Sequence, residues 1–166
     1  MECNVRNWLV HPDSITDRLI EKAGEASLMV LAQGFERACA WDKKIFNDVI
    51  DKVWCREIVM FAQGEAYWYA RTIIPETTYA NNQDFFDQLK IQSLGTLIFN
   101  SPIVQRKTLT SYVINEKMHE YQWIPESVKP YPTQPLWVRL SHLILHEHFP
   151  FYLVEILLPA AERYNN

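Results

Sequence analysis

Two apolar runs separated by a tight-turn signal constrain the fold of this chain more than any other feature. The runs cover residues 53–61 and 66–74, and the four residues between them read Ala-Gln-Gly-Glu. Glycine in a two-residue loop tolerates a positive φ, so the pattern predicts a β-hairpin with the Gln-Gly pair at its tip. Counting back from that loop along both strands places Arg56 directly opposite Arg71.

The predicted register creates an electrostatic problem at these two arginines. Like charges directly opposite each other destabilise a sheet, and burying them without an anion costs far more. Glu57 points to the other face in this register, and the arginines share their face with Trp54, Ile58, Met60, Tyr67, Tyr69 and Ile73. Guanidinium groups present forked donors that fit a carboxylate, so this face predicts a pocket for an anion. In the alternative interpretation the arginines pair with Glu57, Glu65 or Glu155, or reach solvent.

Composition and charge exclude several classes of protein. A chain of 166 residues, of which 48% are hydrophobic, is long enough to bury a core as one domain spanning residues 1–166. The net charge of −4 and the isoelectric point near 5.7 provide no basic surface for nucleic acid. The chain has no leader and no apolar run that could span a bilayer. Three cysteines without paired spacing are typical of reduced thiols. We therefore expect a cytoplasmic protein without stable membrane insertion.

Further helix and strand signals lie on both sides of the hairpin. Ser14 precedes apolar positions at helical spacing and Gly24 follows them, which predicts a helix between the two. Four prolines within residues 121–135 predict an extended loop there. Strands are predicted at 26–36, 104–115, 136–146 and 151–158, helices at 82–90 and 94–99, and a short helix or loop at 41–51. Together these elements predict an α+β fold with a single antiparallel β-sheet and short helices.

Two of the predicted helices begin directly after a serine, at Ile15 and at Leu94. Backbone amides in a first helical turn have no acceptor within the helix and lie at the positive end of its dipole, so they can bind an anion. Almost every helix begins in this way, however. The two helix starts therefore indicate a site only if they fold over the arginine face.

Glu155 is the only carboxylate in the apolar run of residues 151–158. A carboxyl group buried in such a strand is usually paired with a cation or carries a proton. A structural role, through a salt bridge to Arg139 or a hydrogen bond to His142, is one interpretation. A functional role in the anion pocket is the other.

The sequence offers little support for metal or nucleophile chemistry. His142 and His146 lie far apart along one predicted strand and His148 falls in a turn, so we predict no metal site. Cys55 faces away from Arg56 and has no adjacent base, and the chain contains no glycine-rich phosphate loop or Ser-His-Asp order. The available chemistry is that of arginines, one carboxylate and backbone amides, without a cofactor.

Several segments, in order along the chain, resemble the chorismate lyase family. They are Trp8-Leu9 with DSIT at 13–16, WCREI at 54–58, the QGE turn leading to ARTIIP at 70–75, SLGTLIF at 93–99, LWVRLS at 136–141 and LVEILLP at 153–159. Each segment alone is a weak signal, but together they extend over nearly the whole chain with compatible spacing. The resemblance implies a chorismate lyase-like domain. It also implies a cofactor-independent lyase that removes pyruvate from chorismate to make 4-hydroxybenzoate for ubiquinone biosynthesis.

The resemblance also implies which residues form the site. In the family pattern an arginine and two backbone amides hold the carboxylate of the aromatic product, and a glutamate meets its ring hydroxyl. By motif these groups are Arg56, the amides of Ile15 and Leu94, and Glu155, while Arg71 resembles a second pocket arginine. We expect Arg71 to bind the enolpyruvyl carboxylate and stabilise charge as pyruvate departs. We expect Glu155 to orient the ring substituent or to act as a general acid or base.

Two other functions remain open at the level of sequence. The family fold is similar to effector-binding domains of bacterial transcription regulators, which bind small ligands, such as an aromatic carboxylate, without turnover. Those domains normally follow a DNA-binding segment, and only a few residues precede Trp8 here. A different chorismate-using enzyme is the third interpretation. We expect the lyase, with the small molecule chorismate as substrate, no nucleic-acid partner and a monomeric state.

Overall fold

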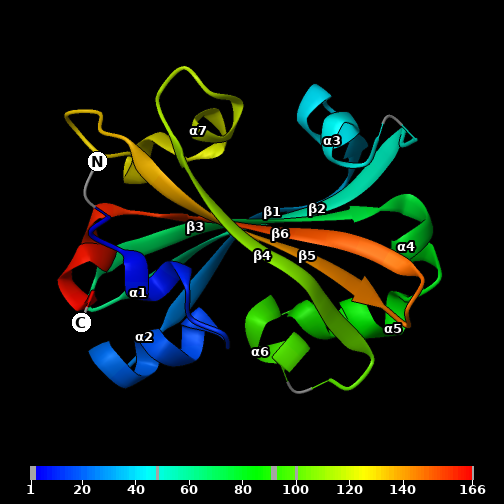
Figure 1. Cartoon of the computed structure of the whole chain (residues 1–166), viewed down its shortest axis with the longest axis horizontal. Coiled ribbons are helices and arrows are strands. Elements are labelled where there is room, and N and C mark those ends of the chain that lie inside the picture. Colours follow the sequence, from blue (N-terminus) through cyan, green and yellow to red (C-terminus); the bar gives the residue numbers. More distant parts are fainter. Residues whose placement is uncertain (1–2, 48, 91–92, 100, 166) are drawn as a thin grey trace.

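A six-stranded antiparallel sheet forms the centre of the computed structural model, which describes residues 3–47, 49–90, 93–99 and 101–165 (Figure 1). The strand order is β1-β2-β3-β6-β5-β4, so β1 and β4 are the edges. The strands are β1 (Ser27–Arg37), β2 (Lys52–Ala62), β3 (Glu65–Pro75), β4 (Val104–Ile114), β5 (Leu136–Leu145) and β6 (Phe149–Leu157). The predicted α+β fold with a single antiparallel sheet is therefore confirmed.

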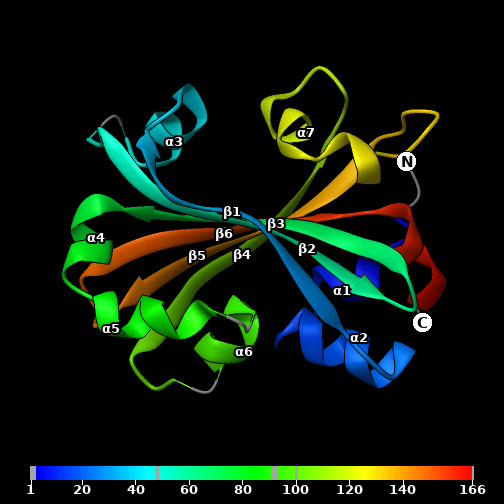
Figure 2. The same ribbon diagram turned by 180° about the vertical axis from the view of Figure 1, so that it is seen from behind.

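Short helices cover both faces of this sheet. We call the face covered by α1 (Arg6–Leu9), α2 (Ile15–Ala23), α5 (Gln83–Phe86) and α6 (Leu94–Phe99) the lower face, as it appears in Figure 1. The upper face is covered by α3 (Ala40–Ile45) and α7 (His119–Trp123), and Figure 2 shows the same two layers from behind. The remaining helical elements are α4 (Glu76–Ala80), η1 (Asp87–Lys90), η2 (Glu126–Val128) and η3 (Pro159–Tyr164). No described helix is long and apolar enough to cross a membrane.

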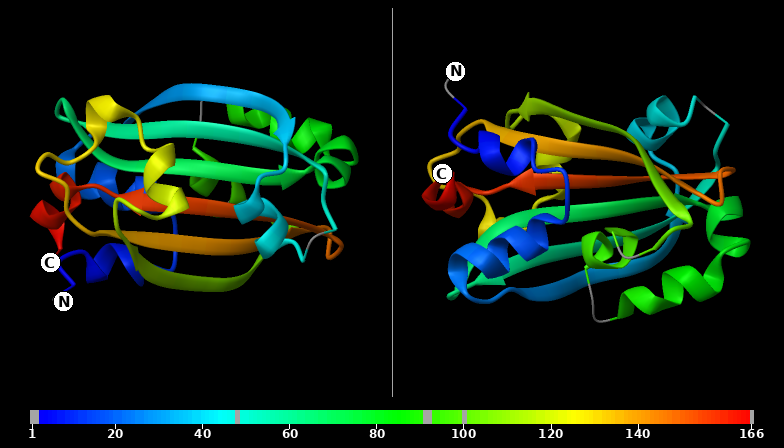
Figure 3. Two further views of the ribbon diagram at one scale, coloured as in Figure 1. Left: turned by 90° about the horizontal axis from the view of Figure 1, so that it is seen from above. Right: turned by 60° about the horizontal axis from the view of Figure 1, so that its bottom comes forward.

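Each face of the sheet has its own apolar core, because neighbouring strand residues point to opposite sides. Ile58, Trp68 and Leu153 belong to the core of the lower face. Val59 and Tyr69 belong to the core of the upper face. Figure 3 shows the upper-face helices in one view and the lower-face helices in the other. A polar side chain on a central strand is therefore buried under one of two separate helical covers.

The cover of the lower face begins where the sequence predicts. Ser14 is in an extended conformation at the N-cap of α2, and Gly24 ends the helix with a left-handed φ of 87°. The helix α6 begins at Leu94, directly after Ser93, also as predicted. These two starts lie on the same side of the sheet as the β2 side chain of Arg56, since both helices line a cavity with it.

The prediction of an extended loop over residues 121–135 holds for residues 129–135, which form no helix or strand, but is wrong where α7 and η2 lie. The helix α7 already begins at His119, and Pro125 precedes the 3₁₀ helix η2. Proline fixes φ near the helical value and is tolerated at a helix start, so it separates these two elements instead of preventing them. The helix α4, which follows Pro75, is likewise absent from the predicted elements.

Candidate active site

A small cavity of about 20 Å³, lined mostly by buried residues, lies between the lower face of the sheet and the starts of α2 and α6. Its floor comes from strands β2, β3 and β6, and its roof from the two helices. It is lined by Thr16, Arg56, Ile58, Trp68, Ala70, Thr72, Ser93, Leu94, Gly95, Leu153 and Glu155. A larger hollow of about 330 Å³ at Asn4, Gln134 and Glu162 is open to the surface and contains no buried cation in its lining. The buried charges of Arg56 and Glu155 therefore single out the small cavity.

Arg56 is a buried cation in this cavity with donors that have no acceptor. The residue is only 2% exposed, and its Nε and Nη2 atoms have no hydrogen-bond partner among the described residues. Burial lowers the pKa of the guanidinium group because the charged form has lost its water. Unpaired buried charge is costly, and an arginine fork fits a carboxylate, so this geometry is that of an anion site.

The starts of α2 and α6 meet over this arginine. A Cβ atom added to Gly95 would lie 2.9 Å from the Ser14 Oγ atom, which shows how closely the two helix starts approach each other. Ser14 is buried and its Oγ has no partner among the described residues. The Oγ atom of Ser93 accepts a hydrogen bond of 3.2 Å from the Thr96 amide. Of the two predicted amide positions, Leu94 lines the cavity, whereas Ile15 does not and lies between Ser14 and the cavity-lining Thr16 in the chain.

Glu155 occupies the same cavity and is paired with Arg139. Its Oε1 atom accepts a hydrogen bond of 2.6 Å from Arg139 Nη1, and both side chains are almost completely buried. The two residues lie directly opposite each other on β6 and β5. The salt bridge to Arg139 that the sequence left open is therefore present. The alternative hydrogen bond to His142 is not, because His142 stacks on Tyr152 across the upper face at 4.5 Å between ring centroids.

The predicted pairing of Arg56 with Arg71 is wrong. The residues flanking the Gln63-Gly64 loop pair as predicted, but β3 contains a bulge near Tyr67, so Met60 pairs with Trp68. Beyond the bulge Arg56 lies opposite Thr72, and Arg71 lies opposite Glu57. A shift of one residue moves every side chain to the other face, so the two arginines point to opposite sides of the sheet.

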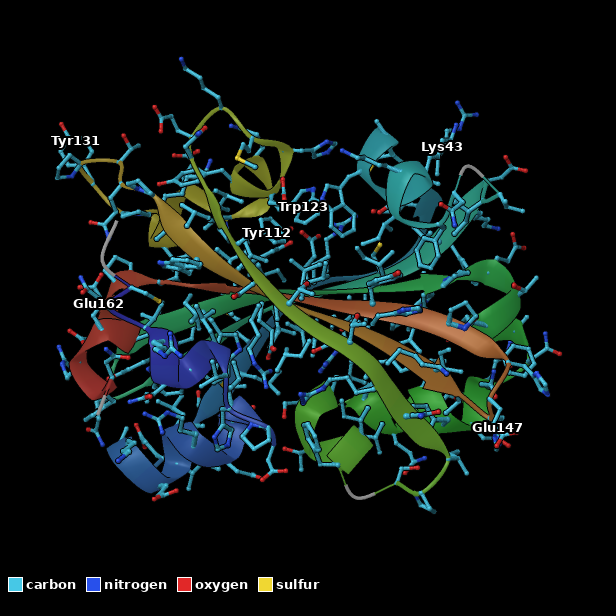
Figure 4. The ribbon with its side chains drawn as sticks, in the orientation of Figure 1. Lys43, Tyr112, Trp123, Tyr131, Glu147 and Glu162 are labelled. Atoms are coloured by element: carbon cyan, nitrogen blue, oxygen red, sulfur yellow. The ribbon has the colours of Figure 1, made fainter. Side chains whose placement is uncertain are left out.

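Arg71 is consequently buried under α3 and α7, away from the other predicted site residues. It forms ion pairs with Glu36 and with Glu57, the latter at 3.4 Å between Nη1 and Oε1. Its guanidinium carbon lies 4.8 Å from the ring centroid of Trp123, which sits on the α7 side of the sheet (Figure 4). Burial lowers the pKa of Arg71, but surrounding groups that include the two glutamates outweigh it, so the pKa is raised. The charge of Arg71 is therefore already balanced by Glu36 and Glu57.

The histidines of the second hairpin and Cys55 lie outside the cavity. His146 and His148 both lie in the turn region between β5 and β6, and the described residues contain no cluster of three or more potential metal-binding side chains. Cys55 points to the upper face, opposite to Arg56, and burial raises the pKa of its thiol. A thiol held neutral in this way is a poor nucleophile.

The cavity lining includes residues that the sequence does not predict there, namely Trp68, Ala70, Thr72 and Leu153. The first three are alternate residues of β3 that follow the bulge, and they replace the set predicted from the unbulged register. The sequence indicates Arg139 only as one possible partner for Glu155. Its position directly opposite that glutamate depends on the register of the second hairpin, which the sequence leaves open.

The fold and the site together define a class of protein, namely a single-sheet domain with a buried, unpartnered arginine in a cavity beneath two helix starts. Among solved structures, PhnF from Mycobacterium smegmatis has a TM-score of 0.63 and 14% sequence identity, with 92% of this chain and 66% of that chain covered. The C-terminal domain of the histidine utilization repressor from Pseudomonas syringae pv. tomato has a TM-score of 0.54 and 10% identity, with 82% and 94% covered. These similarities establish the fold alone.

Sequence relatives identify the family within this class. The chorismate pyruvate-lyase of Pectobacterium carotovorum is 25% identical, with 97% of this chain and 80% of the relative covered. That of Hamiltonella defensa is 27% identical, with 96% and 81% covered. The sequence profile of the chorismate lyase family matches residues 1–161. The chain therefore belongs to the chorismate lyase family.

Proposed function

We propose that this protein is a chorismate pyruvate-lyase, which eliminates pyruvate from chorismate and leaves 4-hydroxybenzoate for ubiquinone biosynthesis. The observation that carries the proposal is the buried, unpartnered guanidinium group of Arg56, which faces a cavity also lined by Glu155. A substrate with a ring carboxylate at one end and a hydroxyl group at the other matches this pair. Membership of the chorismate lyase family points to the same substrate.

In this proposal Arg56 and the backbone amides of Ile15 and Leu94 hold the ring carboxylate. Both amides belong to first helical turns and therefore have no acceptor within their helices. Glu155 accepts a hydrogen bond from the ring hydroxyl at the other end of the cavity. Apolar side chains such as Ile58 and Leu153 contact the ring between the two ends.

The reaction requires positioning and charge stabilisation more than a reactive side chain. The bond between the ring carbon and the ether oxygen breaks, and its electron pair leaves with the oxygen as the enolate of pyruvate. The adjacent ring carbon loses its proton as the ring becomes aromatic, and the enolate takes up a proton to give pyruvate. Aromatisation drives this step, so the scheme needs no cofactor. Glu155 contacts the ring next to the breaking bond and is the group placed to orient it or to move a proton.

Arg71 enters the proposal differently from the sequence-based prediction. The family resemblance implies contact between this arginine and the departing carboxylate, but the bulge in β3 turns Arg71 to the upper face. We propose that Arg71 instead holds β3 in place from the upper face, through Glu36 and Glu57. Its strand neighbours Ala70 and Thr72 line the cavity.

Substrate entry requires the roof of the cavity to move. A volume of about 20 Å³ is close to that of a single water molecule and far smaller than a substituted benzene ring. The close approach of Ser14 and Gly95 makes the contact between α2 and α6 the place where opening is expected.

Turnover of chorismate tests the proposal. Purified protein is incubated with chorismate and a chelator, and pyruvate and 4-hydroxybenzoate are quantified over time. We expect the two products in a 1:1 ratio, and an Arg56→Met variant purified in the same way controls for a contaminating lyase. Binding without release of pyruvate would indicate a sensor domain instead. Release of a different aromatic product would indicate another chorismate-using enzyme.

We propose further that the protein acts in the cytoplasm as a monomer, without a nucleic-acid partner. The floor of the cavity from β2, β3 and β6 and its roof from α2 and α6 belong to the same chain, which supports a monomer. Light scattering after size-exclusion chromatography tests this part of the proposal. The expected mass is that of one chain, 19.6 kDa.

A further inference from the structure

We propose that Arg139 is a positioning residue that fixes Glu155 against the hydroxyl end of the ligand and ties it to the segment leading into α2. The inference rests on the proposed function, because it concerns how this same cavity recognises 4-hydroxybenzoate. Arg139 does not line the cavity, so it acts through Glu155 and through the protein backbone.

The contacts of Arg139 join the floor of the cavity to its cover. Its Nη1 atom donates to Glu155 Oε1 at 2.6 Å. Its Nη2 atom donates to the carbonyl oxygens of His11 at 2.7 Å and Asp13 at 3.1 Å. These two carbonyls belong to the three residues before Ser14, the N-cap of α2. The guanidinium group of Arg139 thus contacts both the Glu155 carboxylate on β6 and the backbone segment that precedes the Ile15 amide.

Burial makes this arrangement rigid. The side chains of Arg139 and Glu155 are 2% and 7% exposed, so neither can exchange its partner for water. A planar fork holds its partners at fixed angles, whereas lysine offers a compact point charge. Since the carboxylate is oriented by Nη1, the direction in which Glu155 can accept a ligand hydroxyl is also set by Arg139.

A neighbouring arginine provides a matched control. Arg106 on β4 donates from Nη2 to the carbonyl oxygen of Pro12 at 2.9 Å, and its guanidinium carbon lies 5.0 Å from the ring centroid of Phe99 at the end of α6. Arg106 therefore restrains the same segment as Arg139. Among the described residues it forms no salt bridge with Glu155, which pairs with Arg139. We therefore expect a variant of Arg106 to loosen the cover and to leave Glu155 paired with Arg139.

The test compares two ligands that differ only in the hydroxyl group. Dissociation constants for 4-hydroxybenzoate and benzoate are measured by calorimetry for the wild type and for Arg139→Gln, Arg139→Lys and Arg106→Gln. Both ligands carry the carboxylate for Arg56, so the ratio of the two constants isolates recognition of the hydroxyl group. Thermal melting and circular dichroism establish that each variant is folded.

We expect the wild type to prefer 4-hydroxybenzoate. In Arg139→Gln this preference should fall by about tenfold or more, the size expected when a hydrogen bond to a charged group is lost. Arg139→Lys should lose part of the preference, by about threefold, because it restores the charge without the fork. Arg106→Gln should keep the preference within about twofold, while its affinity for both ligands falls by the same factor.

An unchanged preference in Arg139→Gln and Arg139→Lys would overturn the role of Arg139. An equal loss in Arg106→Gln would also overturn it, since the effect would then come from the cover alone. If Arg139→Gln does not fold, Arg139→Lys decides between the same two outcomes. A wild type without any preference for 4-hydroxybenzoate would overturn the proposed ligand itself, and this inference with it.

Discussion

Arg56 is the residue on which the proposed function depends most directly. Its guanidinium group is buried, and two of its nitrogen atoms have no partner among the described residues. A protein that keeps such a group without an anion forfeits stability, so the group is expected to be retained for a ligand. Function and stability should therefore respond to its removal in opposite directions.

We expect Arg56→Met to lose activity without losing stability. The value of kcat/KM for chorismate should fall by a factor on the order of 10² to 10³, comparable to the loss of an oxyanion donor. The free energy of unfolding without ligand should stay constant or rise by about 1–2 kcal/mol, because an unpaired buried cation is gone. Steady-state kinetics and urea denaturation measure the two quantities. A variant that is fully active, or strongly destabilised, would contradict this assignment.

Arg71 should show the opposite behaviour. In Arg71→Met, Glu57 and Glu36 lose their common cation, of which Glu57 is the more buried. We expect the free energy of unfolding to fall by about 1–3 kcal/mol, since part of this cluster is reached by solvent. The loss in kcat/KM should be smaller than in Arg56→Met, measured under conditions where both variants are folded. A larger loss in Arg71→Met would place this arginine at the substrate after all.

At the scale of elements, we expect the contact between the starts of α2 and α6 to control access of the ligand to the cavity. We expect Gly95→Ala to speed the dissociation of 4-hydroxybenzoate by about tenfold, because the added methyl group would lie 2.9 Å from Ser14 Oγ. Stopped-flow displacement measures this rate. The double variant Gly95→Ala with Ser14→Ala removes the clashing atom and should recover most of the wild-type rate. A double variant as fast as Gly95→Ala alone would exclude this contact as the cause.

The elements also show what could be predicted from sequence. The helix starts at Ile15 and Leu94, the Gln63-Gly64 loop and the second hairpin are all where the sequence patterns indicate. The bulge near Tyr67 could not be predicted, because the residues around it are apolar or aromatic and both faces of β3 are buried. Such a strand lacks the polar-apolar alternation that fixes a register. The register predicted without the bulge therefore places Arg71 on the wrong face of the sheet. The prediction for Arg56 and Glu155 is unaffected, because both line the same cavity.

On the scale of the whole molecule, the sheet separates two buried polar sites. The lower face holds the cavity with Arg56, Glu155 and Arg139, and the upper face holds the cluster around Arg71. The lower site has an unpartnered cation, whereas the cation of the upper site is paired. This difference supports our proposal that the ligand binds on the lower face and that Arg71 supports the sheet from the upper face.

Because Cys55 is buried on the upper face, the free energy of unfolding should decrease at alkaline pH. Burial raises the pKa of Cys55 above its usual value of 9.0, so the folded protein keeps a proton that the unfolded chain releases. The folded state then binds more protons, and stability must fall as pH rises above about 9, by up to about 1.4 kcal/mol per pH unit. Urea denaturation between pH 8 and about 10 measures this slope. Cys55→Ala should flatten it, and an unchanged slope in that variant would exclude Cys55 as its origin.

The position of the bound product tests the central claim most directly. A crystal structure with 4-hydroxybenzoate should show the ligand on the lower face, beneath the starts of α2 and α6. Its carboxylate should contact Arg56 and the amides of Ile15 and Leu94, and its hydroxyl group should contact Glu155. A ligand bound on the upper face beside Arg71 and Trp123, or one whose carboxylate points toward Glu155, would contradict the account.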